Sequence, residues 1–445
     1  MKLWDKGKDT NKFVENYTIG NDNKMDMYLA ESDVIGTLAH IKMLCKVGLL
    51  KEDELSQLHH ELVVIYKSIE QSNFSIESGI EDVHSQIEYL LTIKLGEIGK
   101  KVHSGRSRND QVLVDIRLFT RDSLIEIISE INLLFQLLIE QSEKNKDVLM
   151  PGYTHLQVAM PSSFGLWFGA YAEALADDLN LILSSYQINN QNPLGSAAGY
   201  GSSFPLDRTL TTKLLGFDDL DYNVVYAQMG RGKVEKIVAF VLANFASTIG
   251  KMSADICLFM SQNFGFIGLP DELTTGSSIM PHKKNPDIFE ITRGKCNRLQ
   301  ALPVEIGYIT GNLTSGYFRD YQLIKESYLP IFDVVVDIIK AARLGVKNLI
   351  INKDILSDSK YDYLFTVEKV NELVLQGIPF REAYKLVGNE VETGTFIPNK
   401  NINHTHEGSI VNLCNKEIEN KFNAVLNKFN VEKVITAKEK LLQDS

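Results

Sequence analysis

Proline is absent from the first 150 residues, and neither glycine nor proline occurs between Gly105 and Pro151. Because these two residues are the strongest local breakers of regular structure, their absence permits one very long helix. Apolar residues recur there at helical spacing, from Val112 through Leu124 to Leu138. A helix of some forty residues runs to roughly 60 Å, so it needs long neighbouring helices to cover it.

Cysteine is also scarce, with four residues far apart and no C-x-x-C pair. This argues against a disulfide framework or a zinc site and favours buried thiols in a reducing cytoplasm. We see no apolar run of membrane-spanning length and no signal-peptide core at residues 1–6, so we expect no membrane partner. A net charge of -11 argues against nucleic acid as a partner. Any site for an anionic substrate must therefore be made positive locally.

Three further stretches largely free of breakers, 162–190, 233–262 and 320–348, are helix candidates, and no βαβ alternation is visible. The chain is therefore predicted to be all-α with a long central bundle. We place the domains at residues 1–106, 107–352 and 353–445. The bundle segments are joined by connections rich in breakers, of which residues 265–286 form a long stretch without clear periodicity. Loops of that length in compact proteins tend to be functional or disordered.

Residues 276–286 read G-S-S-I-M-P-H-K-K-N-P. Gly276 and Pro281 mark a loop, and Asn285, Pro286 and Asp287 indicate the start of a helix. Backbone amides at a helix N-terminus, with the positive end of the helix dipole, favour negative charge.

A second polar cluster, H-S-G-R-S-R-N-D-Q, occupies residues 103–111. Ser107 and Asp110 form the pattern of a capping box at the start of the long helix. That structural role does not explain Arg106 and Arg108, because cations at a helix N-terminus oppose the dipole. We therefore predict that this turn binds a carboxylate.

Two more segments are candidates. In P-G-Y-T-H-L-Q at 151–157, His155 is suited to acid/base chemistry, although a lone loop histidine is more often structural. At 316–325, Arg319, Gln322 and Lys325 share one helical face, which indicates a carboxylate site or, nearly as well, a solvated face.

For residues 81–84, E-D-V-H, spacing alone favours a structural role, with the acids able to pair with a guanidinium. The glycines at 193–201 and 230–232 lack a nucleotide-binding context.

The loop at 276–286 resembles the signature of the fumarase/aspartase superfamily, G-S-S-x-M-P-x-K-x-N-P. Other segments resemble argininosuccinate lyases. They are the clusters at 103–111 and 151–157, the P-L-G-S at 193–196, the spacing of Tyr317, Gln322 and Lys325, and G-I-P-F-R-E-A at 377–383. The resemblance runs from about residue 20 to about residue 390. It implies a three-domain subunit in a homotetramer with a twenty-helix core and active sites built by three subunits. The implied reaction splits argininosuccinate into L-arginine and fumarate, with no metal or organic cofactor.

The same resemblance implies roles for individual residues. Ser277 is the base, His155 and Glu290 form a proton-transfer pair, and Lys283 with the loop amides stabilises the carbanion. The implied substrate-binding residues, including those of the 106–109 turn, are Arg106, Ser107, Arg108, Asn109, Thr154, Asn285, Tyr317, Gln322 and Lys325.

Some positions depart from the family pattern. Leu323 and Ile324 stand where acids are common, Arg231 is flanked by glycines rather than acids, and Val367 follows Thr366 where an acid is common. These changes bear on the contacts to the arginine part of the substrate. Two alternatives remain: a superfamily lyase acting on adenylosuccinate, aspartate or malate, and a non-catalytic structural protein of the crystallin kind.

Overall fold

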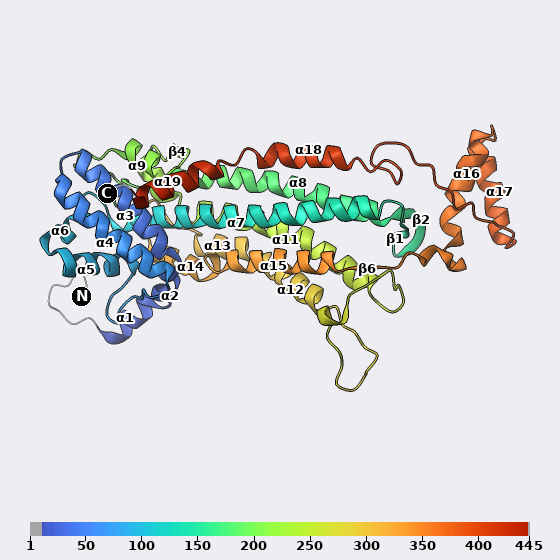
Figure 1. Cartoon of the computed structure of the whole chain (residues 1–445), viewed down its shortest axis with the longest axis horizontal. Coiled ribbons are helices and arrows are strands. Elements are labelled where there is room, and N and C mark those ends of the chain that lie inside the picture. Colours follow the sequence, from blue (N-terminus) through green and yellow to red (C-terminus); the bar gives the residue numbers. More distant parts are fainter. Residues whose placement is uncertain (1–10, 444–445) are drawn as a thin grey trace.

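The computed structural model describes residues 11–443, so the expectation about a signal peptide at residues 1–6 lies outside the described part. The molecule is elongated, with a cluster of helices at one end and a long bundle extending from it (Figure 1). The helices of the cluster are α1 (Lys12–Ile19), α2 (Asp22–Asp26), η1 (Met27–Leu29), α3 (Ala30–Lys46), α4 (Glu52–Glu70), α5 (Val83–Leu95), α6 (Glu97–Lys100) and η2 (Lys101–His103).

The predicted long helix is present as α7 (Arg108–Lys144), whose 37 residues extend about 55 Å. The Ser107–Asp110 capping box begins it, as predicted. In the predicted apolar stripe, Leu124, Ile131 and Phe135 are fully buried, and Phe119 is partly buried. The other main bundle helices are α8 (Phe164–Asn189), α11 (Lys233–Phe259), α12 (Asp287–Leu299), α13 (Leu302–Ile309) and α15 (Ile331–Lys347). Their long apolar faces pack along α7 and each other, which confirms the mostly helical fold.

Helix α11 is long and apolar enough to cross a membrane by length and composition. The sequence expectation that no such run exists was therefore wrong. Of its most apolar stretch, 61% is buried inside the protein, where α11 packs against α8, α12 and α13. Its hydrophobicity is thus that of a core helix covered by neighbouring helices.

The candidate helix at 320–348 is broken into η4 (Arg319–Tyr321), α14 (Gln322–Tyr328) and α15. Pro330 stands at the break, directly before α15. Proline has no backbone N–H and its ring clashes with the preceding helical turn, so a continuous helix is not possible there. The break places the start of α14 beside α2.

Short strands join some of the helices. The connection between α7 and α8 is a β-hairpin of β1 (Leu149–Thr154) and β2 (Gln157–Ser163). Two smaller pairs are β3 (Gln191–Asn192) with β4 (Asp219–Leu220), and β5 (Ile267–Gly268) with β6 (Ile350–Ile351). Short helices in the connections are α9 (Arg208–Leu214), α10 (Val224–Met229) and η3 (Asp271–Leu273).

After α15 the chain extends to the far end of the molecule and then returns along the bundle. The elements η5 (Ile355–Ser357), η6 (Ser359–Phe365), α16 (Thr366–Leu375) and α17 (Phe380–Glu392) lead to the far end, where α16 and α17 form a small unit (Figure 1). Then α18 (Asn415–Leu426) returns along α8, and α19 (Val431–Gln443) packs on α3. The domain boundaries at 106 and 352 stay predictions.

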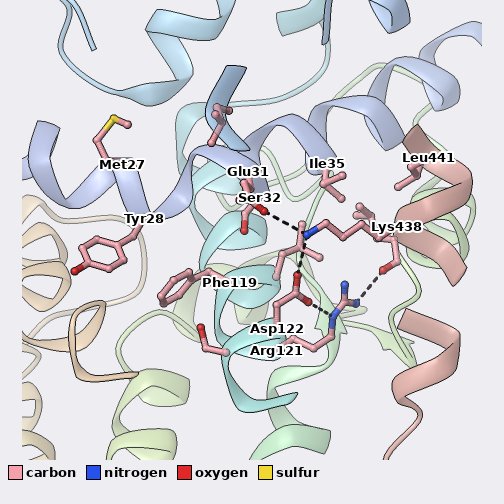
Figure 2. Close-up of a pocket in the computed structure, with 14 residues that line it drawn as sticks. Met27, Tyr28, Glu31, Ser32, Ile35, Phe119, Arg121, Asp122, Lys438 and Leu441 are labelled. Carbon is pink, nitrogen blue, oxygen red and sulfur yellow. Dashed lines mark hydrogen bonds and ion pairs between the residues drawn. The ribbon is translucent and has the colours of Figure 1, made fainter. Parts of the chain in front are cut away.

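Helix α19 is held at the N-terminal cluster by charged contacts around a cavity of about 210 Å³ (Figure 2). Lys438 lies 3.3 Å from Glu31 and 3.8 Å from Asp122. The main-chain oxygen of Leu441 also lies 2.8 Å from Nε2 of His59. The last helix is therefore part of the scaffold that positions α3 and the start of α7.

Candidate active site

A cavity of about 160 Å³ lies where the first turn of α7 meets α2, the segment before α5 and the start of α14. Five of the predicted substrate-binding residues line it together: Arg108, Asn109, Tyr317, Gln322 and Lys325. Because they come from two segments about 200 residues apart, only the fold brings them together. The predicted face of Arg319, Gln322 and Lys325 also points into this cavity, so it is not merely a solvated face.

Glu81 joins two guanidinium groups at this cavity. It lies 3.1 Å from Arg108 and 3.0 Å from Arg319, and Asp82 lies 3.2 Å from Arg108. Asp82 also caps α5 by accepting from the backbone N–H of Ser85. The acids of the E-D-V-H segment therefore pair with guanidinium groups, and they fix the direction in which Arg108 presents its charge.

Lys325 is buried between two carboxylates that sequence reasoning missed. Its Nζ lies 2.6 Å from Asp26 and 2.8 Å from Asp22, and Gln322 donates to Asp22 at 2.8 Å. Burial alone lowers the pKa of Lys325, but the attraction of Asp26 and Asp22 outweighs it, so the pKa lies above its usual value. The signal available in the sequence was the i, i+4 spacing of the two acids in D-N-K-M-D.

His84 forms a second buried network, also missed from the sequence. Its Nδ1 contacts Asp33 directly and lies 3.4 Å from Asp115. Burial lowers the pKa of His84, but Asp33 outweighs it and raises the pKa. The ligand atoms of these three side chains lie within 4.8 Å of one another, a spacing that suits a metal. The direct contact with Asp33, however, makes this group a hydrogen-bonded ion pair, and His84 reaches the cavity wall.

Arg106 and Ser107 have structural partners in the turn before α7. Arg106 donates to the Thr37 hydroxyl at 3.0 Å and is not among the residues that line the cavity. The Ser107 hydroxyl accepts from the backbone N–H of Asn109 at 3.2 Å. Their roles in substrate binding stay predictions.

His155 is exposed at the tip of the β1–β2 hairpin, next to exposed Thr154. Thr154 pairs with Gln157, so His155 and Leu156 form a two-residue turn, and both have positive φ, 53° and 58°. Positive φ at both positions is characteristic of a type I′ turn, which glycine and asparagine usually occupy. The conformation costs energy, and strained backbone of this kind is typical of functional sites.

The 276–286 loop projects away from the bundle just before α12 (Figure 1). The Ser277 hydroxyl accepts from the amides of Ile279 and Met280 at 3.4 and 3.3 Å. Lys283 is exposed, and Asn285 closes the base of the loop by pairing with Thr275. A helix begins here as expected, but Asn285 does not cap it: Pro286 is the N-cap of α12, and no side chain makes a capping hydrogen bond there.

Within one chain, the candidate residues therefore fall into separate groups. The cavity lies at the first turn of α7, whereas the His155 hairpin follows the other end of this helix (Figure 1). Ser277, Lys283 and Asn285 lie in the projecting loop, and Glu290 is exposed in the first turn of α12. A single chain does not bring together Ser277, His155 and the candidate cavity.

Comparison with known proteins defines the class. A family model described as Lyase matches residues 7–301. The fold is similar to an EDDS lyase solved in complex with formate, with a TM-score of 0.79, 23% identity and coverage of 98% and 95% of the two chains. It is also similar to a class II fumarase from Schistosoma mansoni, with a TM-score of 0.72, 16% identity and coverage of 97% and 95%. The chain is thus built as a lyase of the fumarase/aspartase superfamily.

Sequence relatives define the family within that class. An argininosuccinate lyase from Parabacteroides distasonis is 58% identical over 442 residues, 99% of each chain. One from Phocaeicola vulgatus is 59% identical with the same coverage. One from Thermotoga neapolitana is 38% identical over 389 residues, 87% of this chain and 98% of the relative. The chain belongs to the argininosuccinate lyase family, a family of carbon–nitrogen lyases.

Proposed function

We propose that this protein catalyses the reversible elimination of 2-(N-omega-L-arginino)succinate to L-arginine and fumarate, in the cytoplasm and as part of arginine biosynthesis. The observation that carries the proposal is the near-complete match to argininosuccinate lyases at 58–59% identity. The cavity supports it, because five of the predicted substrate-binding residues converge there.

The proposed chemistry begins with a weakly acidic C–H beside a substrate carboxylate. Ser277 removes this proton, and Lys283 with the loop amides stabilises the charge that builds up. One preorganised donor of this kind is typically worth about 3 kcal/mol. The carbon–nitrogen bond then breaks, its electron pair leaves with the guanidinium nitrogen of the arginine, and this nitrogen is protonated. The pair of His155 and Glu290 handles this second proton transfer, a contribution of about 10²–10⁴-fold. In the structure Ser277 already accepts hydrogen bonds from two loop amides, which favour a negatively charged oxygen.

We further propose a homotetramer in which each active site combines segments of three chains. The separation of the cavity, the His155 hairpin and the 276–286 loop within one chain supports this assembly. So does a groove of about 580 Å³ on the bundle surface, between α11 and α13. Exposed Phe240, Val304 and Tyr308 line it, with exposed fractions of 59%, 54% and 84%. Large exposed apolar surfaces on a long bundle indicate packing against other helices.

The departures from the family pattern affect the cavity unequally. Ile324 is buried in the core, and Leu323 is exposed beside a neighbouring depression. Arg231 lines the cavity and is buried, 2.9 Å from Glu235, while it donates to the main-chain oxygen of Tyr321 at 3.1 Å. Glu235 thus supplies an acid that the glycines on either side of Arg231 do not provide.

The deciding experiment follows fumarate release by ultraviolet absorbance, without added metal, from argininosuccinate, adenylosuccinate, aspartate and malate in parallel. We expect turnover of argininosuccinate only. Turnover of another succinyl compound would keep the elimination chemistry and contradict the substrate. Release from none of the four would favour a non-catalytic, crystallin-like protein.

A further inference from the structure

Asp110 connects two segments that lie 85 residues apart. One carboxylate oxygen accepts from the backbone N–H of Ser107 at 2.8 Å. The other accepts from the backbone N–H groups of Gly195 and Ala197, both at 2.9 Å. The side chain is completely buried. A capping role at α7 needs only the first of these contacts, so the other two require a separate explanation.

The segment from 193 to 208 packs tightly around the turn that precedes α7. A Cβ on Gly105 would lie 2.8 Å from the Leu206 side chain, and a Cβ on Gly195 would lie 2.8 Å from the Arg208 side chain. Arg208 also donates to the main-chain oxygen of Leu194 at 2.9 Å. Ala197 has a φ of 53°, a left-handed conformation that is unusual for a residue with a side chain. The turn at 195–197 is thus held in one specific shape by Asp110 on one side and Arg208 on the other.

The same segment also lies beside Gly316, the residue before Tyr317 in the cavity wall. The Tyr200 hydroxyl lies 3.6 Å from where a Cβ on Gly316 would be, and the next residue, Tyr317, lines the cavity. On its other side the segment contacts the turn that leads to Arg108 and Asn109, which also line the cavity. The segment is therefore placed to fix the position of the first turn of α7 relative to Tyr317.

Stability alone does not account for an aspartate at this position. Burial raises the pKa of Asp110 to about 6, even though its backbone hydrogen bonds and nearby Arg106 lower it. Arg208 is the other cation close enough to interact with it. At neutral pH the carboxylate is thus ionised where ionisation is unfavourable. Perturbed groups of this kind gather at functional sites.

We propose that Asp110 is a positioning residue for substrate binding. Its carboxylate fastens the 195–197 turn to the first turn of α7, and this holds Ser107, Arg108 and Asn109 in the geometry that receives a substrate carboxylate. The inference rests on the proposed function, since it assigns these residues to binding argininosuccinate.

The test is Asp110→Asn, which keeps the size of the side chain. The amide keeps an acceptor oxygen on one side only, so its NH2 group faces either the N–H groups of Gly195 and Ala197 or the N–H of Ser107, and the link between the two segments is broken in both cases. We expect KM for argininosuccinate to rise about tenfold or more, with kcat within about threefold, because uniform binding is lost rather than transition-state stabilisation. Hydrogen exchange of the 193–199 amides should accelerate by a similar factor.

The matched control is Asp358→Asn. Asp358 is also an N-cap carboxylate, accepting from the backbone N–H of Lys360 at 3.0 Å, but it lies at the start of η6, outside the 193–208 segment. We expect its KM and its exchange at 193–199 to match the wild type. Unchanged KM in Asp110→Asn would overturn the proposal, as would equal changes in both variants.

A second variant covers the case in which Asp110→Asn does not fold. Arg208→Lys removes the anchor on the other side of the turn, where the Arg208 Nε donates to Leu194, and we expect the same rise in KM and in exchange. A wild-type KM here would overturn the proposal. Failure of the wild type to release fumarate would instead refute the proposed function, and the exchange rates of Asp110→Asn would still decide whether the anchor exists.

Discussion

Lys325 and Asp26 meet at 2.6 Å although 299 residues separate them in the chain. Both side chains are almost fully buried. Asp22 completes the arrangement at 2.8 Å from the same Nζ. The pair fastens α2 to α14 and forms part of the cavity wall, so it links the stability of the N-terminal cluster to the shape of the candidate active site.

Replacing Lys325 by methionine should therefore affect stability and activity together. The change leaves two buried carboxylates without their cation, and breaking a buried pair in this way costs about 3–5 kcal/mol. We expect a lower urea midpoint at pH 7 and a strong loss of fumarate release. Lys340→Met is the matched control, because Lys340 is half exposed and lies 3.9 Å from Glu126. A Lys325→Met protein as stable as this control would contradict the structural role.

Ser277→Ala should abolish most turnover while the assembly stays intact. The Ser277 hydroxyl contacts only amides of its own loop in the described structure, so its removal disturbs no core packing. We expect fumarate release to fall by about 10²–10⁴-fold, the usual contribution of a positioned acid or base. Ser278→Ala, an exposed neighbour in the same loop, measures the effect of disturbing the loop alone. An equal loss in both variants would remove the reason to assign the base to Ser277.

The sequence predicted those features that depend on local rules. The capping box at Ser107 and Asp110 begins α7 where expected, and the apolar spacing of 112–138 gave its buried face. Pro330 ended a predicted helix because a single proline outweighs a favourable pattern. The hairpin at 149–163 was missed because two non-glycine residues with positive φ form its turn.

The partners of the site residues could not be read from the sequence. Arg108 has several acids within reach along the chain, and only the fold selects Glu81 and Asp82. Likewise, nothing local indicates that His84 contacts Asp33, or that Lys325 lies between Asp22 and Asp26. Electrostatic partners are chosen by tertiary packing, whereas caps and periodicity are set within a few residues.

Subunit mixing tests the proposed shared active sites. If one chain supplies Ser277 and another supplies His155, then Ser277→Ala and His155→Asn subunits complement each other after exchange. In a random equal mixture, the chain that supplies Ser277 to a given site is intact at that position with a chance of one half, and so is the chain that supplies His155. About a quarter of the sites therefore regain function. The measurement is fumarate release before and after denaturation and joint refolding. Mixtures whose exchange is confirmed by mass but which stay inactive would show that one chain supplies both residues.

The titration of Asp110 gives a pH dependence with a defined sign. Its folded-state pKa of about 6 lies above the ordinary value of 3.8, with burial as the main cause. The folded state therefore holds the proton more tightly than the unfolded chain, and the contribution to stability is fully present below pH 3.8 and is lost as the pH rises through 6. Between pH 4.5 and 7 the free energy of unfolding loses about 2 kcal/mol of this contribution.

Asp110→Asn lacks this titration, so the two proteins should differ in how stability changes with pH. We expect the free energy of unfolding of the wild type, relative to the variant, to fall by about 2 kcal/mol from pH 4.5 to pH 7. Urea unfolding of both proteins at equal concentration measures it. Arg106 and Arg208, which interact with this carboxylate, stay charged throughout that range, so they do not reverse the sign. A relative stability that stays constant would mean that the backbone donors at Ser107, Gly195 and Ala197 balance the cost of burying the charge, and one that rises with pH would mean that they outweigh it.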